Sequence, residues 1–385
     1  MLALAGIMSA ALATAPLAQA AKPSLPDSRL TNALRNATKD QPGGVIAGVW
    51  LPNGDSWVTA VGKADIEGGQ AMVPGLQIPI GSTTKTLTGT LVMQEVQKDT
   101  IKLSDPLSKW YPSIPKADEI TIAMLLNMSS GIADYVNEQI GEFAQAMSAD
   151  PHHVFDRDEL IAQGAALPRV FDVPGSKFAY SNTNTTLLGR IMEKVTGKTY
   201  EQLLQTRIFD PLGMKRTFLD NTGGLQAPNA QTYSTVSEAL GGPALGRTTD
   251  WGIGWGWAAG GLASTISDMR KWGAAMGTGA GVLNGATQKL RLSDCSPTAH
   301  TAAISSAYCL GLVADRDIKT GDVVTLWHNG QVFGAVSYLG YYPRTGAIVA
   351  VQSNTDVSNV DGKNASMAVK DAIEKAIPRL LGLPR

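Results

Sequence analysis

The sequence predicts a mixed α/β (α+β) fold, with one antiparallel sheet that is formed from both ends of the chain and flanked by helices. Three observations support this prediction. Strand patterns occur near both termini, the middle of the chain lacks long strand patterns, and no Ser/Gly-rich linker divides the chain. We therefore expect one domain at 21–385, with a sheet part at about 21–102 and 261–385 and an inserted, mostly helical part at about 103–260.

The composition indicates a globular protein with a large core. Of the 385 residues, 44% are hydrophobic and 17% are charged, compared with about 25% charged residues in an average soluble protein. The formal net charge is -1, so the chain offers no excess of Lys and Arg to bind a nucleic acid. The same composition excludes long disorder, collagen and coiled coil.

Residues 1–20 have the pattern of a signal peptide. The segment carries no charge, consists mostly of Ala and Leu, and ends in Ala-Gln-Ala, so we expect cleavage before Ala21 and export to the periplasm or the medium. The alternative is a membrane anchor, but Pro16 and Gln19 interrupt a run that is barely long enough to span a bilayer. We therefore expect no stable membrane anchor after cleavage.

The first elements of the domain follow from local patterns. A short helix is expected near 28–38, and apolar, β-rich runs at 45–51 and 56–61 predict two strands. Residues 52–55 (PNGD) between them are typical of a hairpin turn. Apolar residues at helical spacing then predict a helix at 82–97.

The remaining elements are expected to be helices in the middle of the chain and mostly strands near its end. Short helices are expected in the inserted part at 122–126, 157–166, 183–196 and 200–208. Strands return at 310–314, 323–328, 336–342 and 347–352. A closing helix is expected at 365–381, with Val369, Ile373 and Ile377 on its apolar face.

Ser82 and Lys85 form the first candidate catalytic pair. They lie three residues apart at the start of the expected helix, so the amine can reach the hydroxyl, and a helix N-terminus favours a developing oxyanion. This suits a serine nucleophile with a lysine base, provided that burial removes the lysine proton. The alternative is that Ser82 only caps the helix. A second copy, Ser113 and Lys116, lies in a Pro-rich loop that cannot hold the pair on one helical face.

Two further motifs could complete a site. Tyr180-Ser181-Asn182 offers a phenol and an amide just before a helix, and Tyr135-Val136-Asn137 is a competing copy. For a polar group on a strand edge, Lys319-Thr320-Gly321 lies in a polar turn, whereas His328-Asn329-Gly330 ends an expected strand. We therefore prefer the second of these two strings.

In this order and spacing, Ser82-x-x-Lys85, Tyr180-x-Asn182 and His328-x-Gly330 resemble the serine β-lactamase and DD-peptidase superfamily, which includes penicillin-binding proteins. The sequence is most similar to the branch of class C β-lactamases, secreted D-alanyl-D-alanine carboxypeptidases and related esterases. Stretches at 121–135, 174–188, 209–214 and 258–269 resemble the same proteins, so the similarity covers about residues 40–355.

The resemblance implies a role for each catalytic residue. Ser82 would be the acylated nucleophile, and Lys85 and Tyr180 would share the proton transfers. His328 occupies the place where β-lactamases usually carry Lys, so a substrate carboxylate would lack a fixed positive charge unless His328 is protonated.

The resemblance also implies substrate-binding residues. Asn182 would bind the substrate amide, and the backbone N–H groups of Ser82 and of Gln331, the residue after Gly330, would form the oxyanion hole. Asn329 replaces the usual Thr or Ser.

Three other features have less specific interpretations. Cys295 and Cys309 could form a disulfide in an exported protein, or remain two free thiols. The tryptophans at 251, 255 and 257 either line the acyl side of the cleft or pack in the core. The adjacent His152 and His153 point apart, which disfavours a metal site, and no cofactor is expected.

The leading functional hypothesis is an exported serine D-alanyl-D-alanine carboxypeptidase that acts on cell-wall peptides through an acyl-serine intermediate. An esterase of the same fold is the first alternative, followed by a β-lactamase and by a penicillin-binding sensor without turnover. The expected partner is a small-molecule or peptide substrate, such as a cell-wall peptide, an ester or a β-lactam, and not a nucleic acid.

Overall fold

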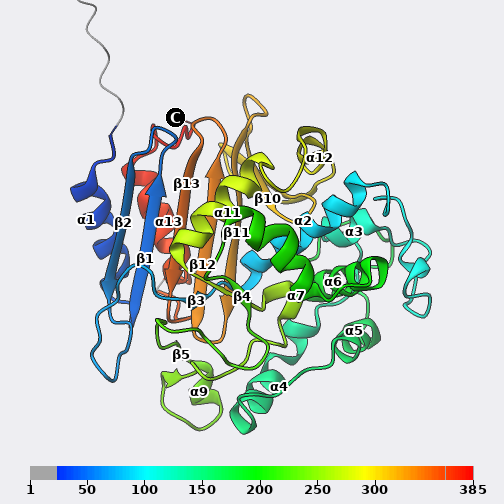
Figure 1. The fold of residues 1–385 in the computed structure, drawn as a ribbon, viewed down its shortest axis with the longest axis horizontal. Coiled ribbons are helices and arrows are strands. Elements are labelled where there is room, and N and C mark those ends of the chain that lie inside the picture. The colour runs from blue at the N-terminus through cyan, green and yellow to red at the C-terminus, as the bar shows by residue number, and fades with distance from the viewer. Residues whose placement is uncertain (1–23, 360, 385) are drawn as a thin grey trace, which may run out of the picture.

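The computed structural model describes residues 24–359 and 361–384, so the expected signal peptide at 1–20 lies outside the described residues. Its central feature is an eight-stranded antiparallel sheet with helices on both faces, which confirms the predicted fold class (Figure 1). The strand order is β2-β1-β13-β12-β11-β10-β9-β8. These strands are β1 (Gly44–Trp50), β2 (Ser56–Gly62), β8 (Ser296–His300), β9 (Ile304–Tyr308), β10 (Val313–Asp317), β11 (Val323–Val332), β12 (Ala335–Tyr342) and β13 (Ala347–Ser353).

Two small sheets and a set of helices complete the fold. The small sheets consist of β3 (Ile78–Pro79), β7 (Leu262–Ser264) and β4 (Phe218–Leu219), and of β5 (Tyr233–Ser234) and β6 (Gly246–Arg247). The α-helices are α1 (Asp27–Thr38), α2 (Thr84–Gln97), α3 (Ile122–Leu126), α4 (Tyr135–Ala149), α5 (Arg157–Ala166), α6 (Asn182–Thr196), α7 (Tyr200–Leu204), α8 (Asp210–Leu212), α9 (Val236–Ala239), α10 (Trp257–Gly260), α11 (Ile266–Thr278), α12 (Gly285–Leu290) and α13 (Ala365–Ala376). Short 3-10 turns occupy Gly81–Thr83 and Leu107–Lys109, and a π-helical turn occupies Gln205–Phe209.

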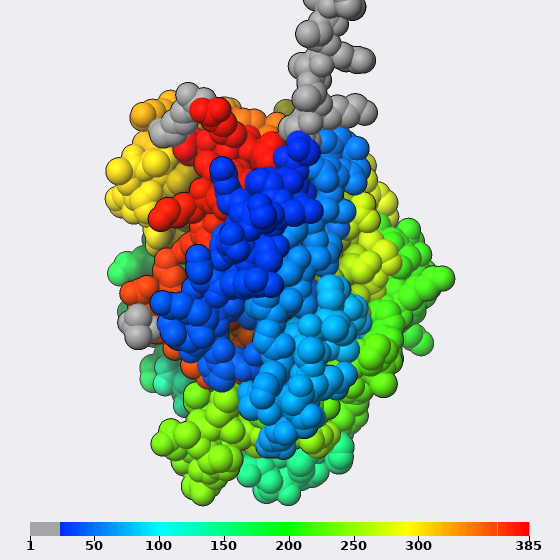
Figure 2. Space-filling model, turned by 90° about the vertical axis from the view of Figure 1, so that its left-hand side faces the viewer, coloured from blue at the N-terminus to red at the C-terminus, as the bar shows by residue number. Residues whose placement is uncertain are grey.

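The two ends of the chain meet in the sheet. Strand β1 pairs with β13, with Val45 opposite Ser353 and Trp50 opposite Ile348. Every residue of β1 is buried because both faces of the sheet are covered. Val45 packs in a core with α1 and α13, whereas the next residue, Ile46, points to the opposite core, as the two-residue period of a strand requires. Figure 2 shows α1 beside the C-terminal residues.

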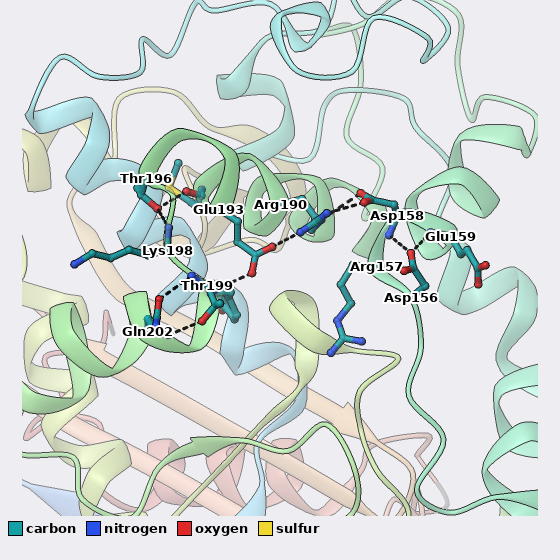
Figure 3. Close-up of polar contacts among 12 residues, drawn as sticks. Asp156, Arg157, Asp158, Glu159, Arg190, Glu193, Thr196, Lys198, Thr199 and Gln202 are labelled. Atoms are coloured by element: carbon teal, nitrogen blue, oxygen red, sulfur yellow. Dashed lines mark hydrogen bonds and ion pairs between the residues drawn. The ribbon is translucent and has the colours of Figure 1, made fainter.

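Charged side chains join helices α5, α6 and α7 (Figure 3). Arg190 of α6 donates to Asp158 of α5 at 2.6 Å and to Glu193, one turn further along α6, at 2.5 Å. Glu193 also accepts a hydrogen bond of 2.9 Å from the backbone N–H of Tyr200, the first residue of α7. These contacts fix α6, which begins at Asn182, relative to its neighbours.

Several boundaries near the C-terminus differ from the prediction. The strand expected at 310–314 forms instead at β10, because Gly311, with a φ of +88°, makes a turn before it. Strand β11 does not end at His328 but continues to Val332, since its polar residues pair with β12. The closing helix ends at Ala376 rather than 381, because Pro378 disfavours helical backbone at the residue before it.

Several elements were not predicted from the sequence, including α4, α11, α12 and the strands β8 and β9. The β8–β9 hairpin at the sheet edge is partly exposed and rich in Ser and Ala, so it lacks a strand pattern. Helix α4 begins where Asp134 accepts a hydrogen bond of 3.0 Å from the backbone N–H of Val136, a cap that the sequence analysis did not consider.

A disulfide between Cys295 and Cys309 links the start of β8 to the end of β9, with an S–S distance of 1.98 Å. It corresponds to the disulfide alternative of the sequence analysis.

Among the described residues, none of the helices combines the length and the apolar character needed to cross a bilayer.

Candidate active site

A cleft of about 730 Å³ lies where the turn before α2, the starts of α4 and α6, and strand β11 meet. Of the eight residues given catalytic or substrate-binding roles in the sequence analysis, six line this cleft: Ser82, Tyr180, Asn182, Asn329, Gly330 and Gln331. The other two, Lys85 and His328, are buried behind it, with 1% and 2% of their surfaces exposed. The structure therefore brings all eight residues together.

Two glycines allow the turn that carries Ser82 to touch strand β11. A Cβ atom on Gly330 would lie 1.9 Å from the carbonyl oxygen of Ile80, and one on Gly81 would lie 2.5 Å from the backbone nitrogen of Gln331. Strand β10 pairs with β11 only up to Trp327, so the edge of β11 beyond that residue is open to the cleft. A backbone N–H of Gln331 can therefore act beside that of Ser82.

Lys85 is held by three oxygen atoms. Its Nζ lies 3.1 Å from Ser82 Oγ, 2.6 Å from Asn182 Oδ1 and 2.6 Å from the carbonyl oxygen of Ala259. The last two oxygens can only accept, so a neutral amine donates its two hydrogens to them and turns its lone pair to the hydroxyl of Ser82. Burial lowers the pKa of Lys85 to about 7, although the charge of Asp134 opposes this shift.

Asp134 was not identified from the sequence. Its carboxylate accepts hydrogen bonds from Asn182 Nδ2 at 3.0 and 2.9 Å and from the Asn182 backbone N–H at 3.2 Å. The side-chain amide of Asn182 is therefore bonded at both ends, to Asp134 and to Lys85, and it is less free to bind a substrate amide than the resemblance implied. The only sequence signal for Asp134 was its place as a cap residue before α4.

Tyr180 lies beside the catalytic pair. Its ring centre is 4.9 Å from Lys85 Nζ, and its hydroxyl is hydrogen-bonded to the Ser82 side chain. Burial raises the pKa of the Tyr180 phenol above its usual value, while the Ser82 hydrogen bond and the Asp134 charge act in opposite directions. The phenol is therefore protonated at neutral pH and can donate a proton.

His328 is neutral in this environment. Its Nδ1–H donates to the carbonyl oxygen of Asn329 at 2.5 Å, so its Nε2 accepts from the hydroxyl of Tyr308 at 3.0 Å. Burial, together with the nearby Lys85, lowers the pKa of His328 to about 3. The imidazole therefore supplies no positive charge for a substrate carboxylate above this pH.

Comparison with known proteins identifies the family. A family model described as Beta-lactamase matches residues 31–374, which is most of the chain. The chain belongs to the beta-lactamase family. The family members are serine hydrolases, and a Ser-Lys pair beside a Tyr in an open cleft fits that chemistry.

The relatives of this beta-lactamase family member are named for several different hydrolytic activities. It is 30% identical over 198 residues to the D-alanyl-D-alanine-carboxypeptidase/endopeptidase AmpH of Escherichia coli, covering 51% of this chain and 47% of that protein. It is 28% identical over 233 residues to a D-aminopeptidase of Brucella anthropi, covering 60% of this chain and 42% of that one. The matches thus span about half the length of these curated relatives.

A solved structure matches over nearly the whole chain. The D-stereospecific amidohydrolase of Streptomyces sp. superimposes with a TM-score of 0.77 at 25% identity, covering 91% of this chain and 98% of that one. The likeness extends the beta-lactamase family assignment to the arrangement of the entire domain.

The Ser113 and Lys319 motifs lie outside the cleft of this beta-lactamase family member, whereas Val136 and Asn137 of the Tyr135 motif line it. Ser113 is exposed, and Lys116 pairs with Glu119 at 3.6 Å. Tyr135 is fully buried and donates to the carbonyl oxygen of Trp255 at 2.7 Å, so it packs in the core beneath the cleft. Lys319 is exposed in the turn between β10 and β11.

The tryptophans are divided between the two expected environments. Trp255 lines the cleft, whereas Trp257 is buried beside Tyr200, and Trp251 is partly buried against Phe333. The structure also describes the adjacent histidines that were considered for a metal site, and His152 Nδ1 donates to the carbonyl oxygen of Thr222. Among residues 24–359 and 361–384, no group of three or more His, Cys, Asp or Glu is arranged to hold a metal ion.

Proposed function

We propose that this chain is an acyl-serine hydrolase that cleaves amide and ester bonds on the carbonyl side of a D-amino acid residue, with Ser82 as the nucleophile. The contact between Lys85 Nζ and Ser82 Oγ carries this proposal, because it joins a hydroxyl to an amine whose pKa is about 7. The activities named for AmpH, the D-aminopeptidase and the D-stereospecific amidohydrolase support a D-configured substrate.

The residues suggest a two-step reaction. Neutral Lys85 takes the proton of Ser82 as Oγ bonds to the substrate carbonyl carbon, and the resulting oxyanion accepts hydrogen bonds from the backbone N–H groups of Ser82 and Gln331. Tyr180 then gives its proton to the leaving nitrogen or oxygen as the bond between that atom and the carbonyl carbon breaks, and the Lys85 ammonium returns a proton to Tyr180, so both groups are restored. Water attacks the acyl-Ser82 ester in the same way and releases the acid.

The leaving group proposed here is neutral. A D-alanyl-D-alanine carboxypeptidase must accept a terminal carboxylate, yet no lysine, arginine or histidine is among the residues that line the cleft, and His328 is uncharged. The likeness to AmpH favours the carboxypeptidase as the second candidate. The apolar segment at 1–20 and this likeness also support the proposal that the chain is exported.

One matched pair of substrates tests the proposal. N-acetyl-D-Ala-D-Ala and its C-terminal amide differ only in the charge of the leaving group. We expect the amide to show at least about tenfold higher kcat/KM, because no fixed cation stabilises the carboxylate. A p-nitrophenyl ester and a chromogenic cephalosporin complete the set, and Ser82→Ala is the control that removes all turnover. A preference for the free acid would favour the carboxypeptidase, and turnover that survives Ser82→Ala would overturn both candidates.

A further inference from the structure

We propose that Asp356 forms an anionic subsite for a protonated amine carried on the acyl portion of the substrate. Asp356 follows strand β13 and lines the same cleft as Ser82, although neither motif analysis nor the family resemblance pointed to it. This inference rests on the proposed function, since acylation of Ser82 defines which part of the substrate is the acyl portion.

The carboxylate of Asp356 is held in place but not fully bonded. Oδ2 accepts hydrogen bonds from the backbone N–H of Gly334 at 3.0 Å and from Ser234 Oγ at 2.5 Å, while Oδ1 accepts a longer bond of 3.3 Å from the backbone N–H of Thr235. A carboxylate has about four acceptor positions, so Oδ1 keeps capacity for a further donor. These bonds position the group without neutralising its charge.

The cleft contains no cation to balance Asp356. Apart from Tyr180, Asp356 is the only ionisable side chain among the residues that line the cleft. It forms no ion pair with any residue in the described ranges 24–359 and 361–384. Lys85 lies beneath the floor of the cleft and is committed to Ser82, Asn182 and the Ala259 carbonyl. A half-buried carboxylate in such a setting attracts a cationic ligand.

The contact of Asp356 with Gly334, just beyond the end of β11, places the amine on the acyl side. The resemblance puts the leaving group near His328 and Asn329, and Gly334 lies beyond Gln331 in the opposite direction along the chain. Gly334 is the third residue after Gln331, a span of at most about 11 Å. An amine that bonds to Asp356 can therefore belong to the same small substrate whose carbonyl oxygen occupies the oxyanion hole.

The wall between these two points is apolar. Trp255 and Phe333 line the cleft with their ring centres 5.2 Å apart. An alkyl chain that leads from the scissile carbonyl to a terminal ammonium would pack against these rings and leave its charge at Asp356. The inferred substrate class is therefore an acyl group that bears a primary amine at the end of a short aliphatic chain, such as a lysine-like side chain.

Two esters of equal length test the subsite. p-Nitrophenyl 6-aminohexanoate carries an ammonium where p-nitrophenyl heptanoate carries a methyl group. We expect Asp356→Asn to lower kcat/KM for the amino ester at least tenfold and to change that of the heptanoate less than threefold. Glu238→Gln is the matched control, because Glu238 is an exposed carboxylate on α9 that does not line the cleft. It should leave the ratio between the two esters unchanged.

The outcomes separate the subsite from the reaction. An equal loss of kcat/KM on both esters would show that Asp356 only holds the hairpin turn at Gly334. No loss on either ester would show that Asp356 does not bind the ammonium group. Either result overturns the subsite. If the wild-type chain hydrolyses neither ester, binding of 6-aminohexanamide and heptanamide to the same full chain decides the subsite, while the D-alanyl substrates described above decide the proposed function. Tighter binding of the amine, lost in Asp356→Asn, would then support it, and equal binding would overturn it.

Discussion

Both oxygens of the Asp134 carboxylate accept hydrogen bonds from the side-chain amide of Asn182, at 3.0 and 2.9 Å. This pairing fixes the amide with its nitrogen towards Asp134, so that its oxygen faces Lys85 Nζ at 2.6 Å. All three side chains are largely buried. Asp134 is therefore a positioning residue that acts on the base through Asn182.

Asp134→Asn should lower kcat/KM on the order of 10², because a free Asn182 amide no longer orients the amine of Lys85. The charge of Asp134 also raises the pKa of Lys85, so its removal should move the acidic limb of the pH profile to lower pH. Asp150→Asn, at the exposed end of α4, is the control. A normal rate with an unmoved limb would assign Asp134 a purely structural role.

The rate of acylation should rise with pH and reach half its maximum near pH 7. The pKa of Lys85 is about 7, so the neutral amine that accepts the Ser82 proton becomes dominant above that pH. His328, with a pKa of about 3, should add no step between pH 4 and 8. Stopped-flow acylation by a p-nitrophenyl ester measures this profile, and Lys98→Ala, an exposed lysine just after α2, should leave it in place. A midpoint above pH 9 would contradict a lysine base of lowered pKa.

Gly330→Ala should lower the rate of acylation by a factor on the order of 10² or more. The new Cβ would lie 1.9 Å from the Ile80 carbonyl oxygen and would push the Ser82 turn away from β11. Labelling by a fluorescent fluorophosphonate measures the loss. Gly285→Ala, where no atom lies within 4 Å of the added Cβ, should label normally. Normal labelling of Gly330→Ala would show that the oxyanion hole lies elsewhere.

His328→Ala should slow the reaction at least tenfold, because it leaves the Tyr308 hydroxyl without its acceptor beside Tyr180. Lys319→Ala, in an exposed turn, should change the rate less than threefold. Steady-state kinetics of the two variants at pH 7 compares them. Equal effects would contradict a special role for His328, and a larger loss for Lys319→Ala would assign that role to the exposed lysine.

Removal of the disulfide should lower the free energy of unfolding by about 3 kcal/mol, the value expected for a closed loop of about 15 residues. A Cys295→Ser and Cys309→Ser double variant, compared with the wild type by denaturant unfolding, measures this change. Because Tyr308 precedes Cys309 and bonds to His328, some loss of activity should accompany it. Unchanged stability would show that the hairpin needs no covalent link.

The part of the site that follows from local spacing could be predicted from the sequence. Ser82 and Lys85 lie three residues apart, so one turn of helix is enough to bring them together. Asp134 could not be predicted as a partner of Asn182, because 48 residues separate them and only the folded chain makes them neighbours. Asp356 is likewise brought to the cleft by the register of β13, which no local pattern reveals.

The charge of a residue depends on burial, which sequence patterns predict poorly at single positions. The residue type of His328 left open whether it was protonated, and its burial beside Lys85 settles that it is neutral. The same limit applies to strands. The apolar β13 was predicted within one residue, whereas the polar, partly exposed β8–β9 hairpin was not predicted at all.

The pairing of β12 with β13 also determines at which stage of synthesis the active site can form. Strand β12, which holds β11 against the turn of Ser82, itself pairs with β13, and β13 ends at Ser353. During synthesis, Ser82 leaves the ribosome more than 200 residues before the strand that completes its surroundings. We therefore expect a nascent or truncated chain that stops short of β13 to be inactive, although it contains every catalytic side chain. Its folding depends on contacts of very long sequence separation, which form slowly.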